Sequence, residues 1–161
     1  MRLILRTSRF FPEPDDRDEA RAAYDDANLK VNELLYRRVD LEDVVSAHQC
    51  ALERAPAIGF GRYIVGATTP FTPDDLALLR TDAPAVVWRL FPECEAVYGR
   101  RGWRMPASLE RVYVNARGRG ELGWSPRYDF QRSPAVRRGS SQPTGGRRGR
   151  EGRMPAARRG T

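Results

Sequence analysis

The chain has 161 residues, enough for one domain with a hydrophobic core but scarcely for two. Its net charge is +7, but residues 131–161 carry nine arginines and one glutamate, so residues 1–130 have a net charge of −1. No apolar stretch approaches the ~18 residues of a membrane span. Two cysteines are too few for a disulfide framework or a zinc site. With no signal peptide at the N-terminus, these features predict a soluble cytoplasmic protein.

The first elements are a predicted strand and two predicted helices. Residues 2–11 begin with consecutive Leu3, Ile4 and Leu5, which predicts a strand buried on both faces, as in a parallel sheet. Such a strand needs neighbours on both sides, so we expect further strands upstream of this chain. Residues 17–24 predict a short helix after a Pro-rich acidic turn, and residues 28–35 have weak helical spacing.

The central stretch, residues 36–48 (YRRVDLEDVVSAH), predicts a strand that runs directly into a helix. Residues 36–39 have the β-branched character of a strand end, and Asp40 is placed as a helix N-cap with Asp43 three residues on. One apolar helical face is then formed by Leu41, Val44, Val45, His48 and Leu52. The helix is expected to end near Pro56, and residues 60–66 predict a second strand.

Later elements have clear start and stop signals. Thr72 and Pro73 predict a helix N-terminus, and an apolar helix over residues 83–91 is stopped by Pro92. Residues 115–122 predict a helix that Gly123 ends. The remaining predictions are a further helical turn over 94–98 and, for residues 108–114, either helix or strand.

From Ser133 onward Gly, Arg, Ser and Pro dominate, and we expect disorder. The predicted domains are therefore 1–130 and 131–161. The tail is open to three interpretations: a nucleic-acid-binding arm, a non-functional extension, or a solvated linker. No aromatic residue lies between Ser133 and Thr161 to stack on bases, and a single lysine beside 27 arginines is typical of GC-rich coding DNA. Nucleic-acid binding is therefore not favoured.

Catalytic motifs are absent from this sequence. It contains no glycine-rich dinucleotide loop after a strand and no Walker motif. The only histidine, His48, is expected to pack as a core residue. The only lysine, Lys30, follows Tyr24 by six residues, so no Tyr-x-x-x-Lys acid–base pair exists. We predict no catalytic residue and no metal site.

Four motifs in order resemble the C-terminal half of the NAD-dependent epimerase/dehydratase family, the extended short-chain dehydrogenases/reductases. Residues 3–12 (LILRTSRFFP) resemble the family's sixth strand, V-I-L-R-x-x-N-x-Y-G-P, and residues 36–48 resemble R-D-F-V-x-V-x-D-V-A. The segments 61–66 (GRYIVG) and 72–76 (TPDDL) resemble Y-N-V-G-x…T-x-x-E-L. Residues 115–126 (NARGRGELGWSP) resemble the closing K-A-x-x-x-L-G-W-x-P.

The resemblance implies an α/β fold over residues 1–130: a partial Rossmann-type sheet, which ends the NAD-binding domain, plus a small α/β substrate domain, followed by the disordered tail. It also implies NAD as cofactor and a nucleotide-sugar-like substrate. The family's NAD-binding loop and Tyr-x-x-x-Lys precede the sixth strand, so Met1 looks like an internal start or a truncation point. A complementing chain would have to supply them.

The resemblance also places five site residues. Ser8 falls near the nicotinamide-facing position, and Arg9 replaces an asparagine that contacts substrate. Tyr36 aligns with a phosphate-binding arginine, with Arg37 and Arg38 beside it. Either arginine suits a diphosphate, and both also suit solvated positions on an edge strand.

The functional hypothesis is a fragment of an epimerase/dehydratase-like protein that is inactive alone. Two alternatives stay open. One is a nucleic-acid-binding module that acts through the arginine-rich tail, and the other is an interaction fragment that docks on a partner through an uncovered apolar surface.

Overall fold

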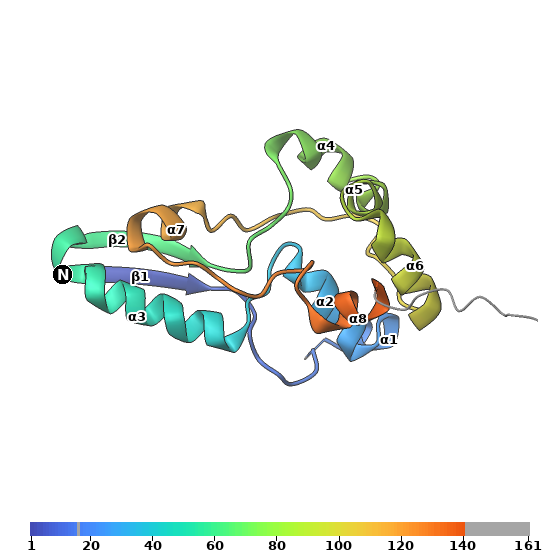
Figure 1. The fold of residues 1–161 in the computed structure, drawn as a ribbon, viewed down its shortest axis with the longest axis horizontal. Coiled ribbons are helices and arrows are strands. Elements are labelled where there is room, and N and C mark those ends of the chain that lie inside the picture. Colours follow the sequence, from blue (N-terminus) through green and yellow to red (C-terminus); the bar gives the residue numbers. More distant parts are fainter. Residues whose placement is uncertain (16, 141–161) are drawn as a thin grey trace, which may run out of the picture.

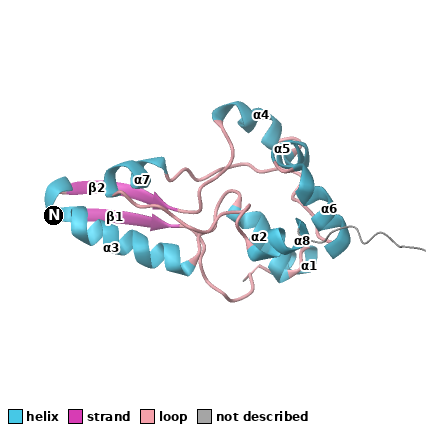
Figure 2. Ribbon diagram, in the orientation of Figure 1, coloured by secondary structure: helices cyan, strands magenta, loops and turns pink. Residues whose placement is uncertain are grey.

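The computed structural model describes residues 1–15 and 17–140 (Figure 1). Its two strands, β1 (Arg2–Thr7) and β2 (Phe60–Val65), pair in parallel with Arg2 beside Phe60 and Thr7 beside Val65. Figure 2 shows the two strands at one end of the molecule and most of the helices at the other. The predicted mixed α/β class is confirmed, whereas the Rossmann-type identity of the sheet stays a prediction.

Helix α3 (Leu41–Ile58) connects back to the start of β2. The Asp40 carboxylate accepts a hydrogen bond from the Glu42 backbone N–H at 2.9 Å, so the predicted N-cap is confirmed. The helix continues past Pro56 and ends at Gly59, where the positive φ of 72° favours glycine.

Helices α3 and α7 (Ala116–Leu122) cover one face of the sheet. Trp124 anchors this packing, because its ring is buried and its Nε1–H donates to the Ser46 hydroxyl at 3.0 Å. α7 ends at Gly123 as predicted, with a positive φ of 69°. This first core contains Val39, Val44, Ala47, Ala51, Tyr63, Val65, Leu122 and Trp124.

A second core lies among the remaining helices. They are α1 (Asp18–Ala23), α2 (Asp26–Leu34), the 3-10 turn η1 (Pro73–Asp75), α4 (Leu76–Leu79), α5 (Ala83–Leu90), α6 (Pro92–Arg101) and α8 (Pro134–Ser140). Of these, α1 contributes no buried residue. The largest buried side chains of this core include Leu35, Leu79, Val86, Val87, Tyr98 and Phe130. Within the described residues no strand contributes to it, which differs from the small α/β substrate domain that was expected.

Buried amides tie α2 to the loop after α6. The side chains of Asn28 and Asn32 both donate to the Arg104 carbonyl, at 3.0 and 2.9 Å. The Tyr98 hydroxyl donates to the Asn32 side-chain oxygen at 2.7 Å. Burial raises the pKa of Tyr98, so this hydroxyl keeps its proton and remains a donor.

The prediction of a strand over residues 36–39 is wrong. Residues 35–37 form a turn after α2, and only Arg38 makes a β-bridge, with Arg9. The backbone N–H groups of Arg37 and Arg38 both donate to the Glu33 carbonyl, which holds the chain in this turn.

The predicted burial of the apolar face of α3 holds for Val44 but is wrong for its other four residues. Leu41, Val45 and Leu52 are 52, 50 and 77% exposed, and His48 is exposed rather than packed in a core. The sheet instead lies against the smaller side chains of Val44, Ala47 and Ala51. Because α3 covers a sheet of only two strands, nothing described lies over its larger apolar residues.

Three further predictions differ from the structure. The first strand ends at Thr7, and Leu3 to Leu5 are half-buried because only one sheet face is covered. Residues 108–114, for which helix or strand was predicted, form neither. The segment 134–140 is helix α8 rather than disordered, because Val136 is buried in the second core.

Residues 141–161, on which the rest of the predicted disorder and the nucleic-acid interpretation depend, lie outside the described residues. Within the described ranges, no helix combines the length and apolar character needed to cross a membrane.

We expect Asp75→Asn to destabilise the start of α4. The Asp75 carboxylate accepts bonds from the Thr72 backbone N–H at 2.8 Å and hydroxyl at 3.0 Å, and it pairs with Arg89. These contacts, chiefly the Thr72 N–H, lower the pKa of Asp75 below its ordinary 3.8. The carboxylate therefore stabilises the fold above pH 3.8, and this contribution is lost as the pH falls through the lowered pKa.

At pH 7 the loss in unfolding free energy should be about 1–2 kcal/mol, measured by urea denaturation. The difference from the native chain should shrink as the pH falls below 3.8. The exposed neighbour Asp74 provides the matched control, and Asp74→Asn should change little. Equal effects from the two substitutions would contradict the capping role.

Candidate functional site

The candidate site lies where β1 and β2 end, at the junction of the two cores. Arg38 and Val39, which follow the turn over residues 35–37, cross this junction, and Arg38 forms a β-bridge with Arg9. The Arg9 N–H donates to the Arg37 carbonyl at 3.1 Å, and the Val39 N–H donates to the Arg9 carbonyl at 2.9 Å. The Ala67 N–H, just after β2, donates to the Arg38 carbonyl at 2.8 Å. These bonds fix the arginine backbones against the carboxyl ends of both strands.

The Glu33 carboxylate gathers three of the arginines. Arg37 binds its Oε1 through Nε at 3.0 Å and Nη2 at 2.7 Å, and Arg38 Nη1 binds Oε2 at 2.9 Å. Arg9 Nε lies 3.6 Å from Oε1. The Glu33 side chain is only 1% exposed, so these guanidinium groups replace the water that an ionised carboxylate requires.

A second buried carboxylate extends this network. Asp15 Oδ2 lies 3.2 Å from Arg9 Nη1, and Asp15 Oδ1 lies 3.4 Å from Arg17 Nε. Arg9 therefore bridges Asp15 and Glu33. Four guanidinium groups face two carboxylates, which leaves the network, defined as these six side chains, with a formal net charge of +2.

A pocket of about 420 Å³ opens beside this network. We call it the arginine pocket, and it is lined by Arg17, Tyr36, Arg37, Ser108, Leu109, Glu110, Arg111 and Tyr113. Arg111 is exposed and forms no ion pair with any described residue. Burial raises the pKa of the Tyr36 hydroxyl, which keeps it protonated as a hydrogen-bond donor. The lining suits an anion with several acceptor oxygens.

Ser8 lies at the end of β1 and is buried, with 6% exposure. Its backbone N–H donates to the Val65 carbonyl at 2.8 Å, but its hydroxyl has no hydrogen-bond partner among the described residues. A Cβ on Gly66 would lie 2.9 Å from the Ser8 hydroxyl oxygen, so glycine is required for this close approach. An unsatisfied buried hydroxyl is costly, and a bound polar group would satisfy it.

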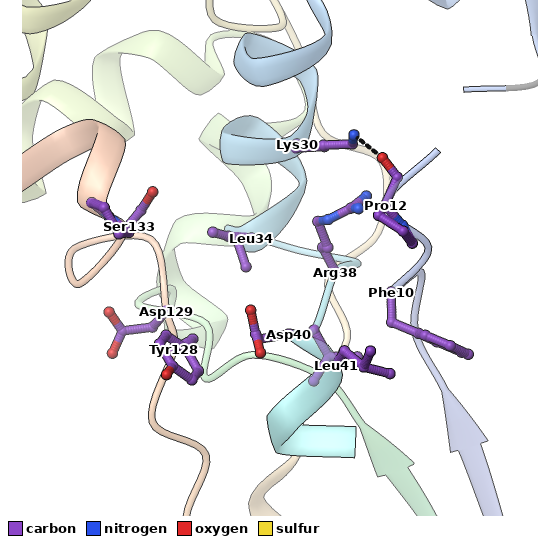
Figure 3. A pocket seen from close by; sticks show the side chains of 12 residues that line it. Phe10, Pro12, Lys30, Leu34, Arg38, Asp40, Leu41, Tyr128, Asp129 and Ser133 are labelled. Atoms are coloured by element: carbon purple, nitrogen blue, oxygen red, sulfur yellow. Dashed lines mark hydrogen bonds between the residues drawn. The ribbon is translucent and has the colours of Figure 1, made fainter. Parts of the chain in front are cut away.

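A second pocket of about 320 Å³ lies between α2, the start of α3 and the segment before α8 (Figure 3). In Figure 3 the Lys30 ammonium turns to the Pro12 carbonyl, to which it donates, and it also binds Asp26 at 2.6 Å. Asp40 and Asp129 accept bonds from nearby backbone N–H groups. The lining is mainly apolar and its charged groups already have partners, so this pocket suits an anion less well.

The five predicted site residues lie in one region but differ in availability. Tyr36 and Arg37 line the arginine pocket, whereas Arg38 lines the pocket of Figure 3. Arg9 is held between the two buried carboxylates. Ser8 lies at the strand end with its hydroxyl unsatisfied.

Four residues of the site were not predicted from the sequence: Asp15, Arg17, Glu33 and Arg111. Glu33 and Arg37 are four residues apart, a spacing from which their ion pair could have been predicted. Arg111 is brought to the site by long-range folding. The contacts of Asp15 with Arg17 and Arg9 are close in sequence but have no helical spacing that would indicate them.

No family model, curated protein or solved structure matches this chain significantly. Within residues 1–15 and 17–140, no three His, Cys, Asp or Glu side chains gather in an arrangement that could hold a metal ion.

We expect Glu33→Gln to be strongly destabilising. The amide would leave Arg9, Arg37 and Arg38 without their shared buried counter-charge. Removing one partner of such a network costs about 3–5 kcal/mol, which denaturant titration would measure. Glu110→Gln, at the exposed rim of the arginine pocket, is the matched control and should change stability little. A loss below about 1 kcal/mol for Glu33→Gln would contradict the role assigned to this carboxylate.

Proposed function

We propose that this chain is the substrate-binding part of an NAD-dependent epimerase/dehydratase-like protein, and that its arginine pocket binds the diphosphate of a nucleotide-sugar-like substrate. One observation carries the proposal: three arginines, Arg17, Arg37 and Arg111, line one pocket. The buried carboxylates beneath it neutralise only part of the surrounding positive charge.

The lining residues have distinct roles in this proposal. Glu33 binds Arg37 through two guanidinium nitrogens, which orients the planar group at the pocket wall. Arg111 has no described ion-pair partner, so it is available to bind phosphate oxygens in a bidentate manner. The protonated Tyr36 hydroxyl donates a further hydrogen bond. The pocket volume of about 420 Å³ falls in the range of small-molecule sites.

The family resemblance implies NAD, which supplies hydride transfer when bound. Ser8 fits such a ligand in one respect only, because its buried hydroxyl has no described hydrogen-bond partner. The sequence contains neither a glycine-rich phosphate loop nor a Tyr-x-x-x-Lys pair. The proposed role of this chain is therefore binding, and catalysis requires a complementing chain with those residues.

Arg111→Ala should weaken binding of UDP-glucose, used as a representative nucleotide sugar in calorimetric titration. Loss of one charge-assisted contact of about 1.5 kcal/mol corresponds to roughly a tenfold lower affinity. Arg80→Ala removes an exposed arginine from the end of α4, outside the pocket, and should leave the affinity unchanged. The proposal fails if the native chain does not bind the nucleotide sugar, or if both variants lose affinity equally.

The purified chain with NAD and a nucleotide sugar should give no NADH signal above background. The reason is chemical, because the chain offers no tyrosine–lysine pair to remove the hydroxyl proton. Absorbance at the NADH band measures this directly, and heat-denatured chain sets the background. Reproducible turnover would overturn the prediction of inactivity alone.

A further inference from the structure

Two neighbouring surfaces of the sheet end are uncovered. The first is the outer edge of β1. The N–H groups of Arg2 and Ser8 donate to carbonyls flanking or within β2, at 2.7 and 2.8 Å. The backbone N–H and C=O groups of successive residues in a parallel strand point to opposite sides of the strand. The N–H and C=O groups of Leu3, Leu5 and Thr7 therefore point away from β2. The described sheet has only these two strands, so this edge is unpaired.

The second uncovered surface is the large apolar face of α3, formed by Leu41, Val45, His48 and Leu52. Figure 1 shows α3 alongside β1, on the side away from β2. On the opposite flank of α3, Ser46 bonds Trp124 and Asp43 binds the backbone after it. The apolar face therefore points past the outer edge of β1, and the two surfaces are continuous.

The combined surface is self-complementary under a twofold rotation. When two copies of α3 pack antiparallel, with the twofold axis passing between His48 and Gln49, Val45 of each copy faces Leu52 of the other. Leu41 of each copy then faces Pro56 of the other. The helix runs antiparallel to β1: Gly59 bonds Arg2 at one end, and Val39 bonds Arg9 at the other. The middle of α3 thus lies beside Leu5, the middle of β1. A single twofold axis can therefore relate both the two α3 helices and the two β1 strands.

We propose that two copies of this chain associate through this surface, with β1 pairing antiparallel to β1 of the second copy and α3 packing on its counterpart. The product is a continuous four-stranded sheet with a helix pair on one face. In the register centred on Leu5, Arg6 lies opposite Ile4, so no arginine lies directly opposite another.

The other sheet edge is less suitable for pairing. The carbonyl of Arg62 points outward from β2, and the Arg117 guanidinium lies 3.5 Å from it. The side chain of Arg117, held by Glu121 at 2.7 Å, covers this edge. The available edge is therefore that of β1.

Light scattering on the full chain should give twice the monomer mass of 18.3 kDa at ~100 µM. Leu52→Asp and Val45→Asp place charges in the apolar contact and should give monomers. Both side chains are half-exposed or more in the single chain, so folding should survive, which circular dichroism checks. Leu78→Asp, on α4 and 44% exposed, is the matched control and should remain dimeric.

A cross-link tests the antiparallel geometry independently. In a Cys50→Ser background, Val45→Cys combined with Leu52→Cys should yield covalent dimer with a short bis-maleimide, whereas Val45→Cys alone should yield little. Hydrogen exchange should show Leu3, Leu5 and Thr7 amides protected in the native chain and exposed in Leu52→Asp. A native chain that is monomeric at ~100 µM, or a dimer that persists in both aspartate variants, would overturn the proposal.

Discussion

The rest of the structure depends on the ion pairs of the buried Glu33 carboxylate with its three arginines. Glu33 stands near the end of α2, in the helical core, and its partners come from the next turn and from the end of β1. An ionised carboxylate in this position is tolerated only with several charge-assisted donors. The arginines must therefore converge, and their convergence holds the sheet against the helices. It also explains why residues after Leu34 form a turn, since Arg37 and Arg38 reach Glu33 with side chain and backbone together.

The same network shapes the arginine pocket. In this network of described side chains the four guanidinium groups outnumber the two carboxylates, Asp15 and Glu33, so its formal charge is positive. Arg37 is rigidly oriented by its two bonds to Glu33, and Arg111 remains available at the opening. A positively charged wall with one pre-oriented guanidinium is a physical basis for binding an anion with several oxygens. The proposed diphosphate site thus depends on a carboxylate that does not itself line the pocket.

The helix α3 shows how an amphipathic pattern and a buried face can differ. Its sequence pattern selects Leu41, Val44, Val45, His48 and Leu52, but of these only Val44 packs on the sheet, together with Ala47 and Ala51. Small side chains let a helix approach a sheet closely, and the larger residues then point beyond the sheet edge. An apolar stripe on a helix indicates that another surface should pack against it. Whether the sheet of the same chain provides that surface depends on how many strands lie beside the helix. Here the edge of β1 and this stripe are open together, which is the physical basis for the proposed pairing of two copies.

The sequence by itself determined the elements whose signals are local. Asp40 as an N-cap, Thr72 at the start of the η1–α4 helix, Gly123 as a helix end and the second strand are all read from neighbouring residues. The five site residues selected from the sequence also lie in one region of the structure, although their roles stay predictions. Only the tertiary structure decided the rest. α8 exists because Val136 packs into a distant core, and Arg9 meets Glu33 because β1 ends beside α2. Such contacts contribute strongly to stability but produce no periodic pattern in the sequence, because long-range ion pairs and packing depend on how distant segments meet in space.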